Sequence, residues 1–550
     1  MKSNREKILF YIGLFVCALI LFGGIYGFSM LDPANISYVY NNYDTEQHYF
    51  GWVAYRDADW RFPIGLHDRL IYPDVTSVIF TDSIPILAFI FKLFSPILPE
   101  TFQYFGLWTL FCMFLSGVFT SLILYIFSDR VGRVFLSSVL MMIVPTVMIR
   151  AFAHEALGAQ WMVLFALWIF CGVFGKKDDT GYLGLLVKTV LLGFLAGSIH
   201  IYFIPICGMV MLGCAVYMIL ADKKPVQAVF MIAAYIGSAA VAIFLWGGFS
   251  VDLPSGNDDY VVGNAANLNT LFNPLDHSLF FSALPISYQG QDDGYGYLGL
   301  GFMAAVAVAV CILVVKSLRQ KKQSDTPMCG DTKAFVISLC VMFLAVLWFS
   351  TYPIISFGSR VFVQYSLPSP INDIMAAFRC NGRGIWVITY TIMILALIAI
   401  CRAPVSGAGQ RLLAGFLVLC IVLQIADLTP LIREKYTYCN EPRIVENPLT
   451  ASQNMQEALA TGRYGHVFMD ESLLWAETST LFATENHLTT NRYYLARQNE
   501  EANRRRNEEG KKNLSSDTFY IFSVDAVDEM ESLGLNIIYH DDYIYVGVTE

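Results

Sequence analysis

A cluster of acidic and aromatic residues near the start of the chain has the residue types of acid–base catalysis. If the stretch that begins at Tyr43 is helical, Asp44 and His48 are four residues apart and share one helix face, with Trp52 one turn further along. A carboxylate oriented beside an imidazole is suited to taking a proton from a sugar or lipid hydroxyl. Glu46 and Trp52 are the substrate-binding candidates of this cluster. An amphipathic helix on a membrane surface would have the same spacing, so the pattern alone leaves both interpretations open.

A short connection between two apolar runs, beginning at Arg150, holds the further candidates His154 and Glu155. Charged residues at the end of a membrane span usually anchor it at the interface. These two nevertheless fall at the outer ends of their spans, at the same expected depth as Asp44 and His200. We therefore expect the four side chains to converge around a cavity that opens outward.

Two arginines precede the apolar run at 385–402. Arg379 and Arg383 are four residues apart, and Gly382 and Gly384 let the backbone approach a ligand closely. Such a pair suits a phosphate or pyrophosphate headgroup, because guanidinium groups bind phosphate in a bidentate manner. The alternative is an aromatic and basic anchor at the membrane interface.

The segment 250–295 is rich in Asn, Asp and Gly, and Gln291 is its substrate-binding candidate. Amide, acidic and aromatic side chains are common in carbohydrate recognition, since hydroxyl groups need several hydrogen bonds and sugar faces stack on rings. Loops with many turns have the same composition whatever their purpose.

The overall composition excludes a soluble globular protein. Of 550 residues, 56% are hydrophobic and only 15% are charged, whereas soluble domains carry roughly 25% charged residues. A net charge of −9 also argues against a nucleic-acid binder, which is expected to have a basic face. The cysteines and histidines have no metal-binding spacing, so no metal ligand is assigned.

Long apolar runs predict eleven membrane spans. Basic residues gather in every second connection, which places the N-terminus in the cytoplasm and the C-terminal region outside. The run 84–98 is short and is interrupted by Lys92, so we predict a juxtamembrane or re-entrant helix there. The predicted spans are 1–28, 103–127, 134–149, 157–174, 182–199, 202–220, 226–249, 296–315, 333–350, 385–402 and 411–430. The basic connections contain Arg130 and Arg133, Lys176 and Lys177, Lys223 and Lys224, Lys316, Arg319, Lys321 and Lys322, and Arg402 and Arg411.

Two domains follow from this pattern. Residues 1–430 form the membrane domain, with a first catalytic loop at 29–82 and substrate loops at 250–295 and 351–384. Residues 431–550 read as a small extracytoplasmic α/β domain, with strands near 466–470, 518–522, 535–539 and 543–548 and a charged helix at 497–512. This domain has 11 basic and 20 acidic residues and so carries the whole net charge. The triple Arg504-Arg505-Arg506 is expected on a solvated helix face.

The first loop, the second acidic connection, the many spans and the outward C-terminal domain together resemble the GT-C superfamily. Its members are integral-membrane glycosyltransferases that use sugars linked to polyprenyl or dolichyl phosphate. The stretches Trp60-Arg61-Phe62-Pro63-Ile64-Gly65 and Phe80-Thr81-Asp82-Ser83-Ile84-Pro85-Ile86-Leu87-Ala88 are similar to a bacterial branch of that group. The resemblance covers nearly the whole chain. Over most of it the resemblance lies in the architecture, and only the first loop and the stretch around Arg379 to Arg383 also resemble the family's motifs.

This resemblance implies a role for individual residues. Asp44 matches the first-loop acid, a catalytic base or acceptor activator, Glu155 matches the second-loop acid, and Arg379 or Arg383 would contact the donor phosphate. The commoner family pattern has two adjacent acids, whereas this chain has Asp44-Thr45-Glu46 with His48, so the division of labour among them stays open. Such a set suits either metal-free chemistry or a divalent cation such as Mg²⁺ or Mn²⁺.

We therefore predict a polytopic α-helical membrane protein with a GT-C-like fold. It would transfer a hexosyl or pentosyl group, with inversion, from a polyprenyl-phosphate donor to a cell-surface glycan, lipid or protein acceptor on the outer face of the cytoplasmic membrane. Asp44, His48 and Glu155 are its predicted catalytic residues. A flippase-like transporter of lipid or polysaccharide is one alternative, although polar residues at mid-membrane depth are few. A non-catalytic scaffold whose outer domain binds cell-wall components is the other.

Overall fold

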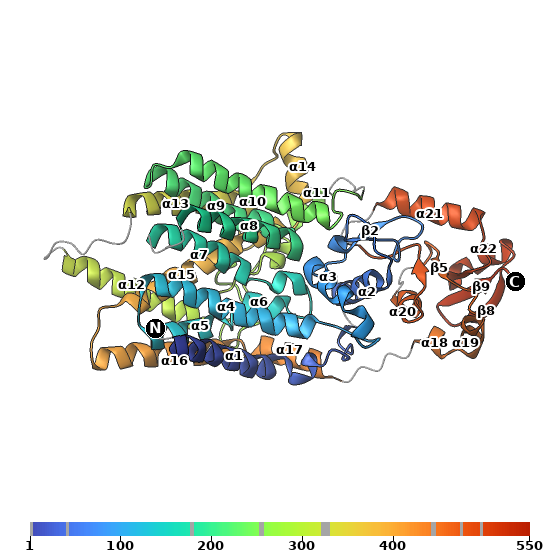
Figure 1. The fold of residues 1–550 in the computed structure, drawn as a ribbon, viewed down its shortest axis with the longest axis horizontal. Helices are drawn as coiled ribbons and strands as arrows, with labels where there is room; N and C mark the ends of the chain where they lie inside the picture. Colours follow the sequence, from blue (N-terminus) through green and yellow to red (C-terminus); the bar gives the residue numbers. More distant parts are fainter. Residues whose placement is uncertain are drawn as a thin grey trace. The chain divides into compact units, whose positions relative to one another are not determined.

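The computed structural model describes residues 4–39, 43–175, 181–251, 258–320, 331–441, 447–473, 477–495 and 499–550. The chain divides into two compact units. The first comprises Met1–Asp32, Tyr104–Ala240 and Ser255–Glu441, and the second comprises Pro33–Gln103, Val241–Pro254 and Pro442–Glu550. The first unit is mainly helical, whereas the second combines helices with a five-stranded sheet (Figure 1).

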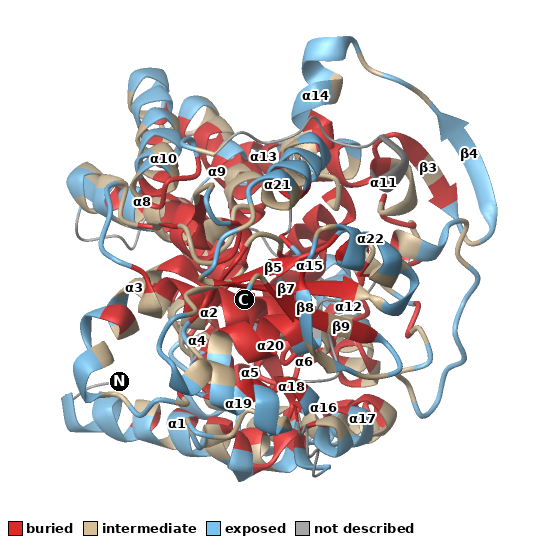
Figure 2. Ribbon diagram, turned by 90° about the vertical axis from the view of Figure 1, so that its right-hand side faces the viewer, coloured by how far each residue is buried: buried red, intermediate tan, exposed pale blue. Residues whose placement is uncertain are grey.

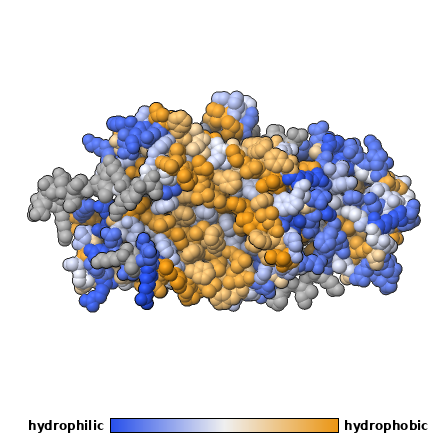
Figure 3. All heavy atoms as spheres, in the orientation of Figure 1, coloured by the Kyte–Doolittle hydropathy of each residue, from blue (hydrophilic) through white to orange (hydrophobic). Residues whose placement is uncertain are grey.

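Eleven helical segments of the described residues are long and apolar enough to cross a membrane, and they match the eleven predicted spans. Their outward side chains form an apolar surface, orange in Figure 3. The predicted class of polytopic helical membrane protein is therefore confirmed. The segments contain α1 (Asn4–Tyr26), α4 (Phe105–Phe127), α5 and α6 (Val131–Met141 and Pro145–Arg150), η5 and α7 (Glu155–Gly158 and Trp161–Gly175), α8 (Gly181–Ile199), α9 (Phe203–Leu220), α10 (Pro225–Leu245), α12 (Leu300–Gln320), α13 (Thr332–Ser350), η7 and α15 (Asn381–Ile385 and Trp386–Arg402) and α16 (Ala408–Asp427). Lys176, Lys177, Lys321 and Lys322, from the predicted basic connections, lie outside the described residues.

Polar side chains of α16 accept hydrogen bonds from the first amides of the neighbouring helix α12. The Asp427 carboxylate accepts hydrogen bonds from the Leu300 amide and the Tyr297 hydroxyl, both at 2.9 Å, and Gln424 accepts one from the Phe302 amide at 3.2 Å. The first amides of a helix have no partner within that helix. Asp427 and Gln424 supply those partners for α12, which explains buried polar residues in an apolar span.

Shorter elements connect the spans of the first unit. The β3–β4 hairpin is antiparallel, and every residue of β4 is exposed, pale blue in Figure 2. Helix α17 continues beyond the last span and packs against α1 and α6. The shorter elements are η1 (Phe28–Leu31), α11 (Asp258–Gly263), η6 (Gln289–Gly294), β3 (Ile354–Phe357), β4 (Arg360–Gln364), α14 (Ser369–Ala377) and α17 (Thr429–Asn440).

In the second unit, the first loop contains α2 (Tyr43–Asp57), the β1–β2 ladder (Leu66–His67 and Thr76–Ser77) and η3 (Val78–Phe80), and the run 84–98 that follows contains α3 (Pro85–Leu93) and η4 (Ser95–Ile97). Helix α3 has nine residues, too few to cross a membrane. Its Lys92 turns inward, where Nζ donates to the carbonyls of Tyr55 at 2.7 Å and Ala58 at 2.8 Å. Lys92 thus caps the end of α2, and burial lowers its pKa to about 8.

The C-terminal sheet has the strand order β6-β5-β7-β9-β8. Strand β5 (His466–Met469) runs parallel to β6 (Thr489–Thr490) and β7 (Thr518–Ser523), and β9 (Ile544–Val548) runs antiparallel to β7 and β8 (Asn536–His540). Because side chains alternate along a strand, Val467 and Met469 join the core on one face and Phe468 the core on the other. The first face is covered by α18, α19 and α20 (Pro448–Ala451, Gln453–Ala460 and Glu477–Glu485), the second by α21 and α22 (Glu500–Lys512 and Val527–Ser532). The small α/β domain is confirmed, and β6 is the strand that the sequence patterns missed.

The first loop and the C-terminal sheet are joined within the second unit. The Tyr72 amide donates to the Thr490 carbonyl at 2.7 Å, and the Thr490 amide donates to the Arg69 carbonyl at 2.8 Å. Asp74 pairs with Arg506 at 2.7 Å and with Arg505 at 3.0 Å. The expectation of a solvated face is therefore wrong for Arg506, which is 6% exposed because it binds this carboxylate.

His67, in β1, is fully buried, and neither ring nitrogen has a hydrogen-bond partner among the described residues. Burial, together with the nearby positive charges of Lys92, Arg61 and Arg69, lowers its pKa to about 3. The unfolded chain binds this proton near pH 6.5, whereas the folded chain does not. The second unit therefore loses stability as the pH falls from 6.5 toward 3.

We predict that His67→Phe weakens this pH dependence. Between pH 7 and pH 5, wild type should lose about 2 kcal/mol more of its free energy of unfolding than the variant does. Denaturant unfolding of the detergent-solubilised chain, followed by tryptophan fluorescence, measures this difference. The exposed His540→Gln is the control and should behave as wild type. Identical pH slopes for wild type and His67→Phe would contradict the prediction.

Candidate functional site

Helix α2 carries the first set of predicted site residues. It covers Tyr43–Asp57, so Asp44 and His48 have the helical spacing that their predicted roles require. Asp44 and Glu46 lie in the first turn and are half-buried, while His48 is buried. Carboxylates in a first turn are stabilised by the positive end of the helix dipole.

Asp82 is the partner that the structure adds to His48. His48 Nε2 lies 3.4 Å from Asp82 Oδ2, within the second unit. The Asp82 backbone has a φ of 56° and that of Ile84 a φ of 52°, a region that residues other than glycine rarely adopt. Ser83 holds this turn against α2, because its hydroxyl donates to the His48 carbonyl at 2.7 Å. Such strained turns concentrate at functional sites, but local sequence does not reveal them.

Gly51 allows α2 to approach this turn. A Cβ atom at Gly51 would lie 2.2 Å from the Thr81 Cβ and 2.7 Å from the Ser83 hydroxyl oxygen. Any larger residue would force the helix and the turn apart. The glycine therefore keeps His48 within reach of Asp82.

We predict that Gly51→Ala separates His48 from Asp82 and destabilises the second unit, despite the higher helix propensity of alanine. The matched control is Gly172→Ala in α7, where no atom lies within 4 Å of the added carbon. The control should be as stable as wild type or more stable by up to about 1 kcal/mol. Thermal unfolding of both variants in detergent measures the contrast, and equal stability would contradict the steric explanation.

Two predicted substrate-binding residues have structural contacts. Trp52 is fully buried, and its indole Nε1 donates to the Phe102 carbonyl at 2.8 Å. Gln291 is 2% exposed, and its side chain bonds to Asn267 at 3.0 Å and to Ser356 at 2.9 Å. These hydrogen bonds within the protein explain why both polar side chains can be buried. Their substrate-binding roles stay predictions.

In the first unit, one carboxylate joins two arginines. Asp293 lies 2.9 Å from Arg150 and 2.8 Å from Arg383, and the arginines are 8% and 7% exposed. Burial acts to raise the pKa of Asp293, but the two guanidinium groups hold it well below its usual range. The cluster thus carries two positive charges on one negative charge. Asp293 and Arg150 were not among the predicted site residues, because their pairing links segments far apart in the sequence.

Aromatic rings surround this cluster. The Arg383 guanidinium lies 4.6 Å from the centre of the Tyr202 ring, and that of Arg150 lies 5.6 Å from the centre of the Trp386 ring. His200 accepts a hydrogen bond from the Tyr202 amide at 3.1 Å through Nδ1. The predicted residue His200 therefore lies beside Tyr202, which was not among the predicted site residues.

The predicted residues His154 and Glu155 belong to the same unit. The His154 amide donates to the Arg150 carbonyl at 2.9 Å, and the Glu155 carbonyl accepts from the Trp108 indole at 2.8 Å. Glu155 is 1% exposed and begins the short η5 segment, and His154, which precedes that segment, is half-buried. Arg379 is also half-buried and follows α14.

Lys435 stabilises the segment that carries Arg150. Its Nζ donates to the carbonyls of Ile149 at 3.2 Å and Ala151 at 2.9 Å. Burial lowers its pKa, and the negative charges of Glu434 and Glu155 partly oppose this shift. Lys435 adds a third cation to the charged residues near Arg150.

We predict that Asp293→Asn destabilises the first unit by roughly 3–5 kcal/mol, because it leaves two buried arginines without a counter-charge. Its exposed neighbour Asp292→Asn is the matched control and should change stability by less than about 0.5 kcal/mol. Denaturant unfolding in detergent provides the measurement. Equal stability of the two variants would contradict the structural role of Asp293.

For a divalent cation, the described residues of the second unit offer an imidazole and carboxylates. His48 and Asp82, 3.4 Å apart, have nitrogen and oxygen ligands that suit Zn²⁺ or Mn²⁺. Two ligands are fewer than the four to six that such ions require. Asp44 and Glu46, in the first turn of the same helix, are the nearest further candidates in sequence.

The helices and the sheet define a multi-pass membrane protein with a small α/β domain. The chain belongs to the family described as domain of unknown function DUF6311, whose model matches residues 15–429, and the model of the DUF6311 C-terminal domain matches residues 455–548. No curated protein matches the chain.

Among solved structures, the chain is similar to the oligosaccharyltransferase of Archaeoglobus fulgidus in its apo form, with 11% identity, a TM-score of 0.45, and coverage of 95% of this chain and 71% of that chain. The chain is also similar to AglB of the same organism in complex with an inhibitory peptide and a dolichol-phosphate, with 10% identity, a TM-score of 0.46, and coverage of 96% of this chain and 71% of that chain. For the A. fulgidus oligosaccharyltransferase in complex with Zn and sulfate, the identity is 11% and the TM-score 0.44, with coverage of 94% of this chain and 69% of that chain.

Proposed function

We propose that this chain is a membrane glycosyltransferase that moves a sugar from a polyprenyl-phosphate-linked donor to a cell-surface glycan, lipid or protein. The main support is the buried pair Arg150 and Arg383, which share the carboxylate of Asp293. A buried cluster with positive charge in excess is costly unless an anion completes it. The phosphate of a lipid-linked donor is an anion of suitable charge and geometry.

In the proposed reaction, an acceptor hydroxyl gives its proton to the Asp44 carboxylate while its oxygen attacks the anomeric carbon of the donor sugar. The bond between that carbon and the phosphate oxygen breaks, and the electron pair remains on the phosphate. Attack from the side opposite the leaving group inverts the anomeric centre. His48 and Glu155 orient the acceptor or the donor.

The departing phosphate gains negative charge as this bond breaks. Arg383, with Arg150 beside it, would stabilise that charge, and Arg379 is a further candidate. Because the guanidinium groups are already fixed by Asp293, they need little reorganisation when the charge develops.

A divalent cation is a further part of the proposal. His48 and Asp82 would be two of its ligands, with Asp44 or Glu46 as candidates for the others. When bound, such an ion supplies Lewis-acid stabilisation of phosphate oxygens.

The proposed place of action is the outer face of the cytoplasmic membrane. The basic connections follow the positive-inside rule, which puts the N-terminus inside and the C-terminal domain outside. We retain 1–430 as the catalytic membrane domain and 431–550 as the extracytoplasmic domain. Membrane lipids surround the spans, and no nucleic-acid partner is proposed.

Replacing the catalytic base tests this function. Asp44→Asn should lower sugar transfer at least 100-fold, because a positioned general base contributes about 10²- to 10⁴-fold. Asp59→Asn, an exposed acid of the same loop, is the control and should keep wild-type activity. Transfer of a radiolabelled sugar from polyprenyl phosphate in membranes that contain the full chain provides the measurement.

Full activity of Asp44→Asn would remove the proposed mechanism. Passage of intact lipid-linked sugar across proteoliposomes without transfer would favour the transporter. If neither Asp44→Asn nor Glu155→Gln changes any activity and cell-wall binding persists, the scaffold would be the better assignment.

A further inference from the structure

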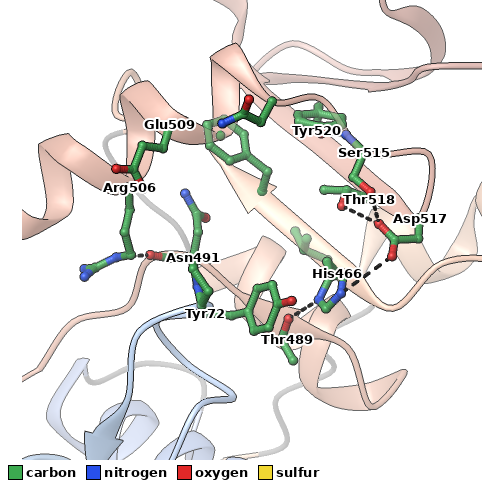
Figure 4. A pocket seen from close by; sticks show the side chains of 15 residues that line it. Tyr72, His466, Thr489, Asn491, Arg506, Glu509, Ser515, Asp517, Thr518 and Tyr520 are labelled. Carbon is green, nitrogen blue, oxygen red and sulfur yellow. Dashed lines mark hydrogen bonds and ion pairs between the residues drawn. The ribbon is translucent and has the colours of Figure 1, made fainter.

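The second unit contains a cavity of about 280 Å³ that shares no residue with the proposed catalytic set. It lies between one face of the C-terminal sheet, helix α21 and Tyr72 of the first loop (Figure 4). Pockets for drug-sized ligands have roughly 300–1,000 Å³. This cavity therefore suits a small ligand, of the size of one ring.

One side of the cavity is flat and aromatic. The rings of Tyr72 and His466 stack with their centres 4.3 Å apart and an angle of 15° between their planes. Phe468 and Tyr520, from β5 and β7, also line the cavity, with ring centres 5.4 Å apart. Rings of this kind offer an apolar face to the C–H groups of a small cyclic ligand.

Some polar groups of the lining are engaged by the protein. The Asn491 side chain bonds to the Met469 amide at 2.7 Å and to the Met469 carbonyl at 3.2 Å. Arg506 is bound to Asp74 at 2.7 Å and to the Asn491 carbonyl at 3.0 Å. These groups shape the cavity and leave little hydrogen-bonding capacity for a ligand.

Other polar groups of the lining can still form hydrogen bonds with a ligand. Within the described part of the chain, the side chains of Glu509 and Asn513 and the Tyr72 hydroxyl have no hydrogen-bond partner. Asp517 accepts from Ser515 at 2.6 Å through Oδ1, whereas its Oδ2 is 3.8 Å from the nearest His466 nitrogen. The cavity thus offers two carboxylates, an amide and a hydroxyl to a ligand.

The charges of the lining restrict the ligand class. Among the lining residues, Arg506 is paired with Asp74, which also binds the exposed Arg505 outside the lining. Burial lowers the pKa of His466 against the opposing effect of Asp517, so its imidazole is mostly neutral at pH 7. Glu509 and Asp517 then leave negative charge in excess, so phosphates and acidic sugars are disfavoured. Both carboxylates are substantially exposed, which screens their attraction for an ammonium group.

We propose that this cavity binds one ring of a neutral carbohydrate, whose hydroxyl groups donate to Glu509 and Asp517 and whose apolar face contacts the aromatic side chains. Vicinal hydroxyls match the paired oxygens of a carboxylate. The site does not depend on the proposed transfer reaction, since sugar binding here needs neither Asp44 nor a lipid-linked donor.

Ligand-observed NMR on the full chain in phosphatidylcholine nanodiscs, which contain no sugar-based detergent, tests this site. The probes are methyl β-glucoside, methyl β-galactoside and N-acetylglucosamine, with 1,5-diaminopentane as the cationic comparison. At least one sugar should show saturation transfer, and Glu509→Gln and Asp517→Asn should each weaken its binding at least fivefold. Glu508→Gln, an exposed acid one position earlier in α21, is the matched control and should bind as wild type.

The proposal is overturned if no sugar binds, if only the diamine binds, or if both cavity variants bind sugar as wild type does. Thermal unfolding of each variant shows that lost binding does not come from lost folding. Asp44→Asn should keep sugar binding here, so failure of the transfer function and failure of this site are distinguishable.

Discussion

The carboxylate of Asp293 is the contact on which the polar end of the helical unit depends. A single charge buried among apolar helices is too costly to persist. Asp293 pairs with Arg150 and Arg383, which belong to two different spans, so one side chain fixes two helix ends and its own loop. The same contact leaves this three-residue cluster with positive charge in excess.

In the second unit, backbone hydrogen bonds hold the first loop against the C-terminal sheet. The backbone amide of Tyr72 and the backbone carbonyl of Arg69, in the first loop, bond to the backbone of Thr490 at the edge of the sheet. An open sheet edge needs such a partner. The Tyr493 hydroxyl also donates to the Glu46 carbonyl at 3.2 Å. The C-terminal domain therefore positions the helix that carries Asp44 and His48.

The site residues differ in how far local pattern could reveal them. The spacing of Asp44 and His48 places them on one face only if the stretch is helical, and α2 meets that condition. Arg383 was noticeable because a basic residue at that end of a span departs from the usual charge bias. Asp82, Asp293 and Lys435 became candidates only through partners that lie far from them in the sequence.

Local patterns in the sequence determined the eleven spans, the short helix α3 and most strands of the C-terminal sheet, because apolar length and alternation report burial directly. Only the tertiary structure decided which charges are buried. Lys92 caps α2 instead of facing a membrane surface, and Arg506 binds Asp74 instead of water. The physical reason is that a buried charge is stabilised by a specific distant partner, and no local pattern identifies that partner.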